Sequence, residues 1–110
     1  MTRLDDDRLD DMTAAIVAIR SHVARGSLTD DLVLDAVRVR LIEIGEAVKG
    51  LSDGLRATEP DIPWRRIAGM RDHLTHSYFL TSHAIVQSTV DDDLSELEAA
   101  VTRMRARIDE

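Results

Sequence analysis

The sequence predicts an all-α protein, a single domain of packed antiparallel helices that covers residues 1–110. Its apolar residues recur at intervals of three and four, which places them on one face of a helix. No segment alternates apolar and polar residues strictly, as a half-buried strand would. Only two prolines and five glycines interrupt the chain, so few positions break a helix. A chain of 110 residues can still bury one modest core.

Two long helices are expected in the first half of the chain, over about residues 4–24 and 30–51. Ser27 with Asp30 fits a capping box at the start of the second helix, and Thr29 is an alternative cap. Each long helix is predicted to bury one apolar seam. The seam of the first helix is Leu9, Met12, Ile16, Ile19 and Val23, and that of the second is Leu34, Val37, Leu41, Ile44, Val48 and Leu51. The last helix of the chain has the seam Val86, Val90, Leu94, Leu97, Val101, Met104 and Ile108.

The second half is expected to begin with a loop over residues 52–62. Pro63 then opens a short third helix, because the N–H that proline lacks has no helical partner at that position. A last helix starts around Ser82 and runs nearly to the end, with a kink near Asp91.

The charge of the chain is uneven. The formal net charge of -7 argues against a protein that coats nucleic acid generally. Residues 63–80 nevertheless contain three arginines and one aspartate, whereas the acidic residues concentrate elsewhere. A basic spot on an acidic body suits a small phosphate site better than a long duplex-binding surface.

Composition also bears on the compartment. There is no cysteine, which excludes disulfides and thiolate metal sites. The first seven residues lack the apolar run of a signal peptide, and no stretch approaches the ~20 apolar residues of a membrane span. We therefore expect a cytoplasmic protein without a membrane partner.

The stretch most indicative of function contains Arg71, His76 and Tyr78. A guanidinium presents a planar fork of donors to a phosphate, and an imidazole transfers protons near neutral pH. Metal-free cleavage of RNA needs a base for the 2′-hydroxyl proton, an acid for the leaving 5′ oxygen and a cation for the phosphoryl oxygens. His73 and His76 lack a third ligand in a matching motif, so we expect no metal and no other cofactor.

The spacing of Arg71 and His76 constrains the site. Five helical steps leave the two side chains about 140° apart around the axis. Either the helix ends near Leu74 or Thr75, or two chains assemble the site. One chain offers one well-placed histidine for two proton transfers, and a symmetric dimer would bring two copies of His76 to a shared cleft.

Several other residues are candidates for supporting roles. Glu43 and Glu46 lie on the second helix, where either carboxylate can pair with an arginine of the third helix or face solvent. Gly45, in mid-helix, favours a close approach of another backbone. Arg66 belongs to the basic cluster, and His73 is read first as an ordinary helix residue and second as part of the site.

These residues carry a resemblance to a known family. Ile-Gly-Glu-Ala at 44–47, Ile-Pro-Trp at 62–64 and Gly-Met-Arg at 69–71, which runs into Arg-x4-His-x-Tyr at 71–78, resemble the HepT-like (DUF86) branch of the HEPN domains. The resemblance implies an antiparallel four- to five-helix bundle that dimerises and forms a composite cleft at the dimer interface.

The same resemblance implies a function. HepT proteins are toxin ribonucleases of type II toxin–antitoxin pairs, with RNA as substrate and an MntA-type minimal nucleotidyltransferase as antitoxin, so a larger hetero-oligomer is also conceivable. It implies catalytic roles for Arg71 and His76, a site-lining role for Asp72 and an AMP-acceptor role for Tyr78. Adenylylation of Tyr78 would add negative charge and bulk beside the cleft. Asp72 stands where the family often has asparagine, and its carboxylate can neutralise Arg71.

Two other interpretations stay open at this point. One is a catalytically silent helical module that binds a nucleotide or a protein through Arg71 and His76. The other is a plain structural dimer, in which substitutions at these residues change only stability.

Overall fold

The computed structural model describes residues 3–76 and 79–109, and every regular element in that part of the chain is a helix. In chain order the elements are α1 (Arg3–Arg25), α2 (Asp31–Gly50), α3 (Asp53–Ala57), α4 (Trp64–His76), α5 (Phe79–Ser88), the π-helix η1 (Thr89–Asp93) and α6 (Leu94–Ile108). Because α5, η1 and α6 follow one another directly, the described chain forms five helical rods. Among these helices, none is long and apolar enough to cross a bilayer.

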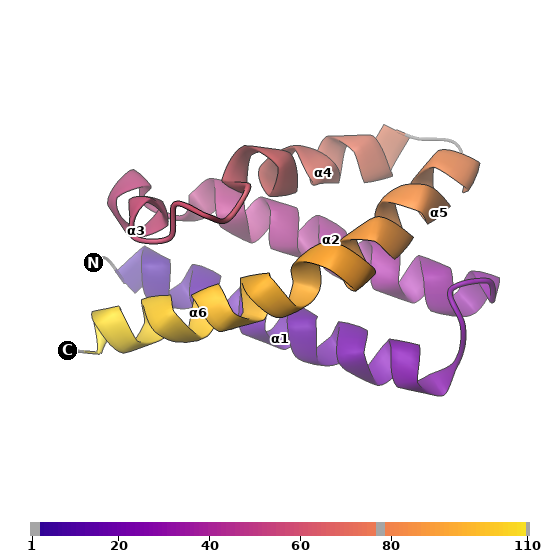
Figure 1. Ribbon diagram of the computed structural model, residues 1–110, viewed down its shortest axis with the longest axis horizontal. Helices are drawn as coiled ribbons and strands as arrows, with labels where there is room; N and C mark the ends of the chain where they lie inside the picture. The colour runs from indigo at the N-terminus through magenta and orange to yellow at the C-terminus, as the bar shows by residue number, and fades with distance from the viewer. Residues whose placement is uncertain (1–2, 77–78, 110) are drawn as a thin grey trace.

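Helix α2 is the centre of the bundle. It packs against α1 along one side and against α4 along another, while α5 also reaches α2 and α6 lies on α1. Figure 1 shows α4 above α2 and the two ends of the chain at the same end of the molecule. The fold prediction of an all-α bundle is confirmed.

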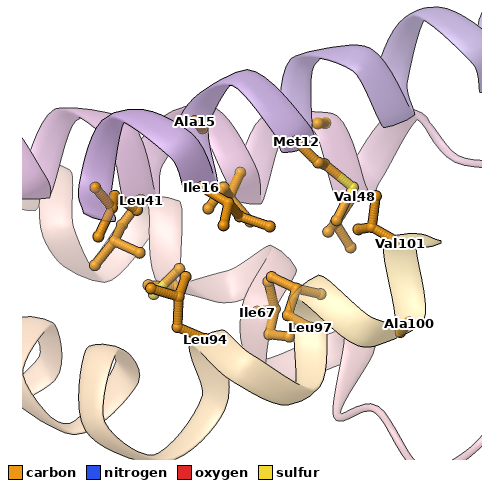
Figure 2. Close-up of a cluster of buried hydrophobic side chains, with 14 of the residues drawn as sticks. Met12, Ala15, Ile16, Leu41, Val48, Ile67, Leu94, Leu97, Ala100 and Val101 are labelled. Carbon is orange, nitrogen blue, oxygen red and sulfur yellow. The ribbon is translucent and has the colours of Figure 1, made fainter. Parts of the chain in front are cut away.

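The predicted seams form the core. All six seam residues of α2 are buried, as are four of the five in α1, with Val23 partly buried. In the last rod five seam residues are buried, and Val90 and Ile108 are partly buried against the edge of the core. Figure 2 shows side chains from α1, α2, α4 and α6 meeting in one cluster that includes Ile16, Leu41 and Ile67. Truncating a fully buried leucine such as Leu41 to alanine costs about 2–5 kcal/mol.

The start of α2 differs from the predicted capping box. Asp30 is the N-cap, with extended backbone, and its side chain accepts a hydrogen bond from the Leu32 N–H at 2.9 Å. The Ser27 hydroxyl accepts from the Thr29 N–H at 3.1 Å instead, within the preceding turn. The residue immediately before the helix satisfies its free N–H groups, so the more distant serine is left to the turn.

The predicted loop over residues 52–62 contains the short helix α3, which the sequence analysis missed. Ser52 caps α3 by accepting from the Leu55 N–H at 3.3 Å. The buried carboxylate of Asp5 in turn accepts from the Ser52 N–H and hydroxyl, both at 2.8 Å. A contact 47 residues away in sequence thus stabilises the cap, and local propensity does not reveal such a contact.

Helix α4 begins as predicted. The Pro63 carbonyl accepts from the Ile67 N–H at 3.1 Å, so proline stands at the helix start. The last rod begins at Phe79, a few residues before the predicted Ser82. Its predicted irregularity near Asp91 is present as η1, and Figure 1 shows the rod changing direction between α5 and α6.

Helices α2 and α4 approach each other most tightly at Gly45. A Cβ atom added to Gly45 would lie 3.1 Å from the Arg71 Cβ, 3.2 Å from the Ile67 carbonyl oxygen and 3.3 Å from the Arg71 nitrogen. These are backbone or backbone-proximal atoms, which move only if the helix moves. The close backbone approach that Gly45 suggested in the sequence is therefore present, beside Arg71.

The free energy of unfolding of the Gly45→Ala variant should be lower than that of the Gly69→Ala variant by about 1–3 kcal/mol, the usual cost of overpacking. Both glycines are helical, so the gain in helix propensity of about 1 kcal/mol is common to both substitutions. A Cβ at Gly69 meets nothing within 4 Å, which makes Gly69→Ala the matched control. Urea unfolding of the two variants measures the difference, and equal stabilities would contradict the close packing.

Candidate functional site

Arg71 lies on α4 where this helix faces α2. Its Nε is paired with Glu46 Oε1, and its Nη1 lies 3.1 Å from Asp72 Oδ1. The pairing of a glutamate of the second helix with an arginine of the third, one of two alternatives in the sequence, is thus present. Glu43 pairs instead within its own helix, with Arg40 at 3.2 Å.

The Arg71 cluster, defined here as Arg71, Glu46, Asp72 and Lys49, is close to charge balance. Lys49 Nζ lies 4.0 Å from Asp72 Oδ1. Gly45 precedes Glu46 on α2, so the close helix contact brings the Glu46 carboxylate within reach of the guanidinium. The cluster is a direct consequence of how closely α2 and α4 pack.

Solvent weakens each ion pair in the Arg71 cluster. The Arg71 side chain is 40% exposed, Glu46 49% and Asp72 60%. Exposed pairs of this kind contribute about 0–1 kcal/mol each. A phosphate, which forms charge-assisted and bidentate hydrogen bonds with a guanidinium, can therefore displace a carboxylate from Arg71 at small cost.

His76 is the last residue of α4 and is exposed. The helix therefore ends within the motif, one or two residues after the Leu74 or Thr75 of the first alternative drawn from the spacing. Arg38 of α2 donates from Nη1 to the Leu74 carbonyl at 3.0 Å, which satisfies one of the carbonyls left open at the helix end.

The continued helix separates the two principal candidates. Because α4 includes both Arg71 and His76, their side chains leave the axis about 140° apart. A single copy therefore presents the guanidinium and the imidazole on different faces of α4.

Arg66 and His73 lie on a third face of α4, toward α5 and η1. Arg66 Nη2 is 2.7 Å from Asp93 Oδ1, and both Arg66 and His73 line a cavity between the helices. The structure thus groups these two predicted supporting residues with each other and does not bring them to Arg71. Tyr78 lies outside the described residues.

Two residues of the site were missed in the sequence. Lys49 follows Glu46 by three positions, and this spacing, which puts them on neighbouring faces, is the signal for a shared cluster. Arg38 gave no local signal, because its partner is a backbone carbonyl 36 residues away. Across residues 3–76 and 79–109, no group of three or more His, Cys, Asp or Glu side chains is arranged to hold a metal ion.

The chemistry available at α4 is that of a cation and a proton carrier on an exposed helix. The guanidinium of Arg71 suits phosphoryl oxygens, and the imidazole of His76 belongs to the side-chain type that most often serves as a general acid or base. A helical bundle that presents these two groups belongs to the class of proteins suited to phosphodiester chemistry.

Comparison with known proteins agrees with this class. Residues 11–104 match the family described as "Ribonuclease HepT-like". The chain therefore belongs to the HepT-like ribonuclease family. No solved structure matched the chain.

Two relatives illustrate the range of similarity. A protein of Thermococcus cleftensis named "Probable ribonuclease HepT" is 33% identical over 110 residues, which cover 96% of this chain and 99% of that protein. A protein of Caldanaerobacter subterraneus subsp. tengcongensis named "Putative RNase TTE0752" is 44% identical over 72 residues. That match spans 64% of each chain, which is slightly less than two thirds of the Caldanaerobacter protein.

Replacing Glu46 with glutamine should strengthen phosphate binding at Arg71 by several-fold, because it removes one of two carboxylates that compete for the guanidinium. Glu43→Gln is the matched control, since it removes the same charge from the same helix but from a pair with Arg40. Titration of inorganic phosphate, followed by the NMR signal of the Arg71 Nε–H, measures the affinity. An equal gain in Glu43→Gln would show a general charge effect and contradict a local one.

Proposed function

We propose that this chain is a metal-independent endoribonuclease and the toxin of a type II toxin–antitoxin pair. The observation that carries the proposal is that α4 presents an exposed guanidinium and an exposed imidazole. Arg71 lies in a charge-balanced cluster whose carboxylates a phosphate can displace, and His76 is the last residue of the helix. Membership of the HepT-like ribonuclease family supports the same reaction class.

The reaction can be written with these groups alone. His76 takes the proton of a ribose 2′-hydroxyl, whose oxygen attacks the adjacent phosphorus. Arg71 binds the phosphoryl oxygens as negative charge grows on them. A second imidazole protonates the 5′ oxygen as its bond to phosphorus breaks, which leaves a 2′,3′-cyclic phosphate and a 5′-hydroxyl.

A symmetric homodimer supplies the second imidazole. In a two-fold dimer the same patch of both copies meets at the interface, so two copies of α4 can present two His76 side chains to one cleft. The angle of about 140° between Arg71 and His76 also becomes useful, because Arg71 of one copy can complement His76 of the other. We propose such a composite cleft as the active site.

Regulation is proposed to act through Tyr78. A minimal nucleotidyltransferase of the MntA type would transfer AMP to the phenolic oxygen of Tyr78. Tyr78 follows His76 by two residues, so chain connectivity keeps the added phosphate and adenosine beside the catalytic histidine. The negative charge would repel RNA, and the bulk would fill the cleft.

One observation favours a second candidate function. Both Glu46 and Asp72 contact Arg71, so the guanidinium of this chain is more fully neutralised than an arginine with one carboxylate neighbour. If phosphate displaces neither, the chain is a catalytically silent module that binds a protein partner through this surface.

Induction of the chain alone in host cells should arrest growth, and His76→Ala and Arg71→Ala should each relieve the arrest. Loss of a general acid–base group lowers a cleavage rate by about 10²–10⁴-fold. Tyr78→Phe should still arrest growth, because it removes only the proposed acceptor of AMP. Normal growth with all of these proteins, each folded and expressed, would favour the silent binding module.

Co-expression of His76→Ala with the wild-type chain should reduce activity beyond simple dilution. If both imidazoles of a dimer are required and copies mix at random in equal amounts, about a quarter of the dimers keep two histidines. Cleavage of a labelled RNA by purified mixtures measures this fraction. Activity that falls only to half would show that each copy works alone.

A further inference from the structure

The α4–α5 pocket is a cavity of about 300 Å³ between α4 and the α5–η1 part of the last rod. Its walls are largely apolar and include Ile67 and Met70 from α4 and Ala84 and Ile85 from α5. Its volume is at the lower end of the range for small-molecule sites in proteins. The residues of the Arg71 cluster do not line it.

One wall of this pocket is the π-helix η1. Thr89, the first residue of η1, is buried, and its hydroxyl donates to the Ile85 carbonyl at 2.7 Å. A hydroxyl bonded to the carbonyl four residues earlier bends a helix, and single π-turns frequently accompany functional sites. The irregular turn and the pocket therefore occupy the same place on the last rod.

The rim of the pocket is polar and charged. Arg66 is 65% exposed, whereas its partner Asp93 is 17% exposed, so the guanidinium covers a fixed carboxylate at the edge of the cavity. His73 lies seven residues after Arg66 and therefore on the same face of α4.

An apolar slot with a cationic rim matches the chemistry of a nucleotide. A base has two apolar faces and a polar edge, and its ribose carries a phosphate. Proteins that bind single-stranded RNA place unstacked bases against guanidinium planes and aromatic rings and bond their edges. Arg66 supplies a plane and donors, Asp93 supplies acceptors, and Ile67 and Met70 supply apolar contact. A wholly apolar ligand would leave the charged rim unused.

The position of the pocket ties it to His76. His76 follows His73 by three residues, so the two side chains are neighbours on the surface of α4. They are separated by about 4.5 Å along the helix axis. A base held in the pocket would thus place its own phosphate beside His76.

We propose that the α4–α5 pocket binds an unstacked nucleobase of the RNA strand, from a nucleotide next to the cleaved phosphodiester. The pocket is then the part of each copy that chooses where the strand is cut. This inference rests on the proposed ribonuclease function, because that function identifies the ligand as RNA. Binding of RNA in the pocket can nevertheless be measured without cleavage.

The test fills the pocket without disturbing the core. Ala84 is exposed and lines the pocket, so Ala84→Phe places a ring in its mouth. Ala99→Phe adds the same ring at an exposed position of α6 outside the pocket and is the matched control. The probe is a 2′-O-methyl hexanucleotide, which has no free 2′-hydroxyl and cannot be cleaved. Methyl NMR signals of Ile67, Met70 and Ile85 report its binding.

The expected result is a shift of these methyl signals on addition of the hexanucleotide to the wild-type chain. Ala84→Phe should weaken the affinity about tenfold or more, the loss seen when one stacked base is removed, and Ala99→Phe should leave it unchanged. On cleavable RNA of random sequence, Ala84→Phe should also lose the base preference of the wild type at one position beside the cut. Methyl shifts without cleavage would uphold the pocket and refute the proposed enzyme activity.

Three results would overturn the inference. The first is the absence of methyl shifts at saturating hexanucleotide. The second is that the shifts arise with AMP or GMP alone and not with the hexanucleotide, which would make the pocket a mononucleotide site. The third is that Ala84→Phe turns a wild-type dimer into a monomer while Ala99→Phe does not, which would make the pocket a contact between copies of the chain.

Discussion

The close packing of α2 against α4 at Gly45 is the constraint on which the rest of the structure depends. Only a residue without a Cβ lets the α4 backbone come this near, since any added carbon would lie within 3.1–3.3 Å of atoms of Ile67 and Arg71. The same contact orders the site, because it brings Glu46 to the Arg71 guanidinium. Arg38, earlier on α2, meets the C-terminal part of α4 at the Leu74 carbonyl. One helix thus positions both Arg71 and the segment that carries His76.

The electrostatics of the site reflect its exposure. Arg71 touches two carboxylates, yet all three side chains remain open to water, so the pairs are weak and exchangeable. A buried guanidinium would be held far more strongly, since removing a partner from a buried pair leaves an uncompensated charge. Asp72 therefore adds a second exposed carboxylate beside the Arg71 guanidinium. One face of α4 carries the Arg71 cluster, and another face carries the pocket beside His73.

Particular elements show how far the sequence could lead. The helices and their buried seams were predicted because a period of three and four residues is a local property of the chain. The Arg71–Glu46 pair was one of two open alternatives, since a spacing shows which residues share a face but not which helices meet. Helix α3 was missed because a contact of Ser52 with Asp5 stabilises its cap. The end of α4 at His76 lies one or two residues beyond the first alternative drawn from the spacing, and Arg38 of another helix bonds a carbonyl there.

The sequence by itself determined that the chain is all-helical, which residues form its core, which family it resembles and which residue types can act on a phosphodiester. Those properties depend on periodicity and on side-chain chemistry, which each residue carries wherever it lies. The tertiary structure alone decided that Arg66 and His73 line a pocket instead of joining Arg71, and that Lys49 belongs to the Arg71 cluster. It also decided that Arg71 and His76 of one copy point to different faces of an unbroken α4. These outcomes depend on how helices distant in sequence pack, and packing is a property of the whole chain.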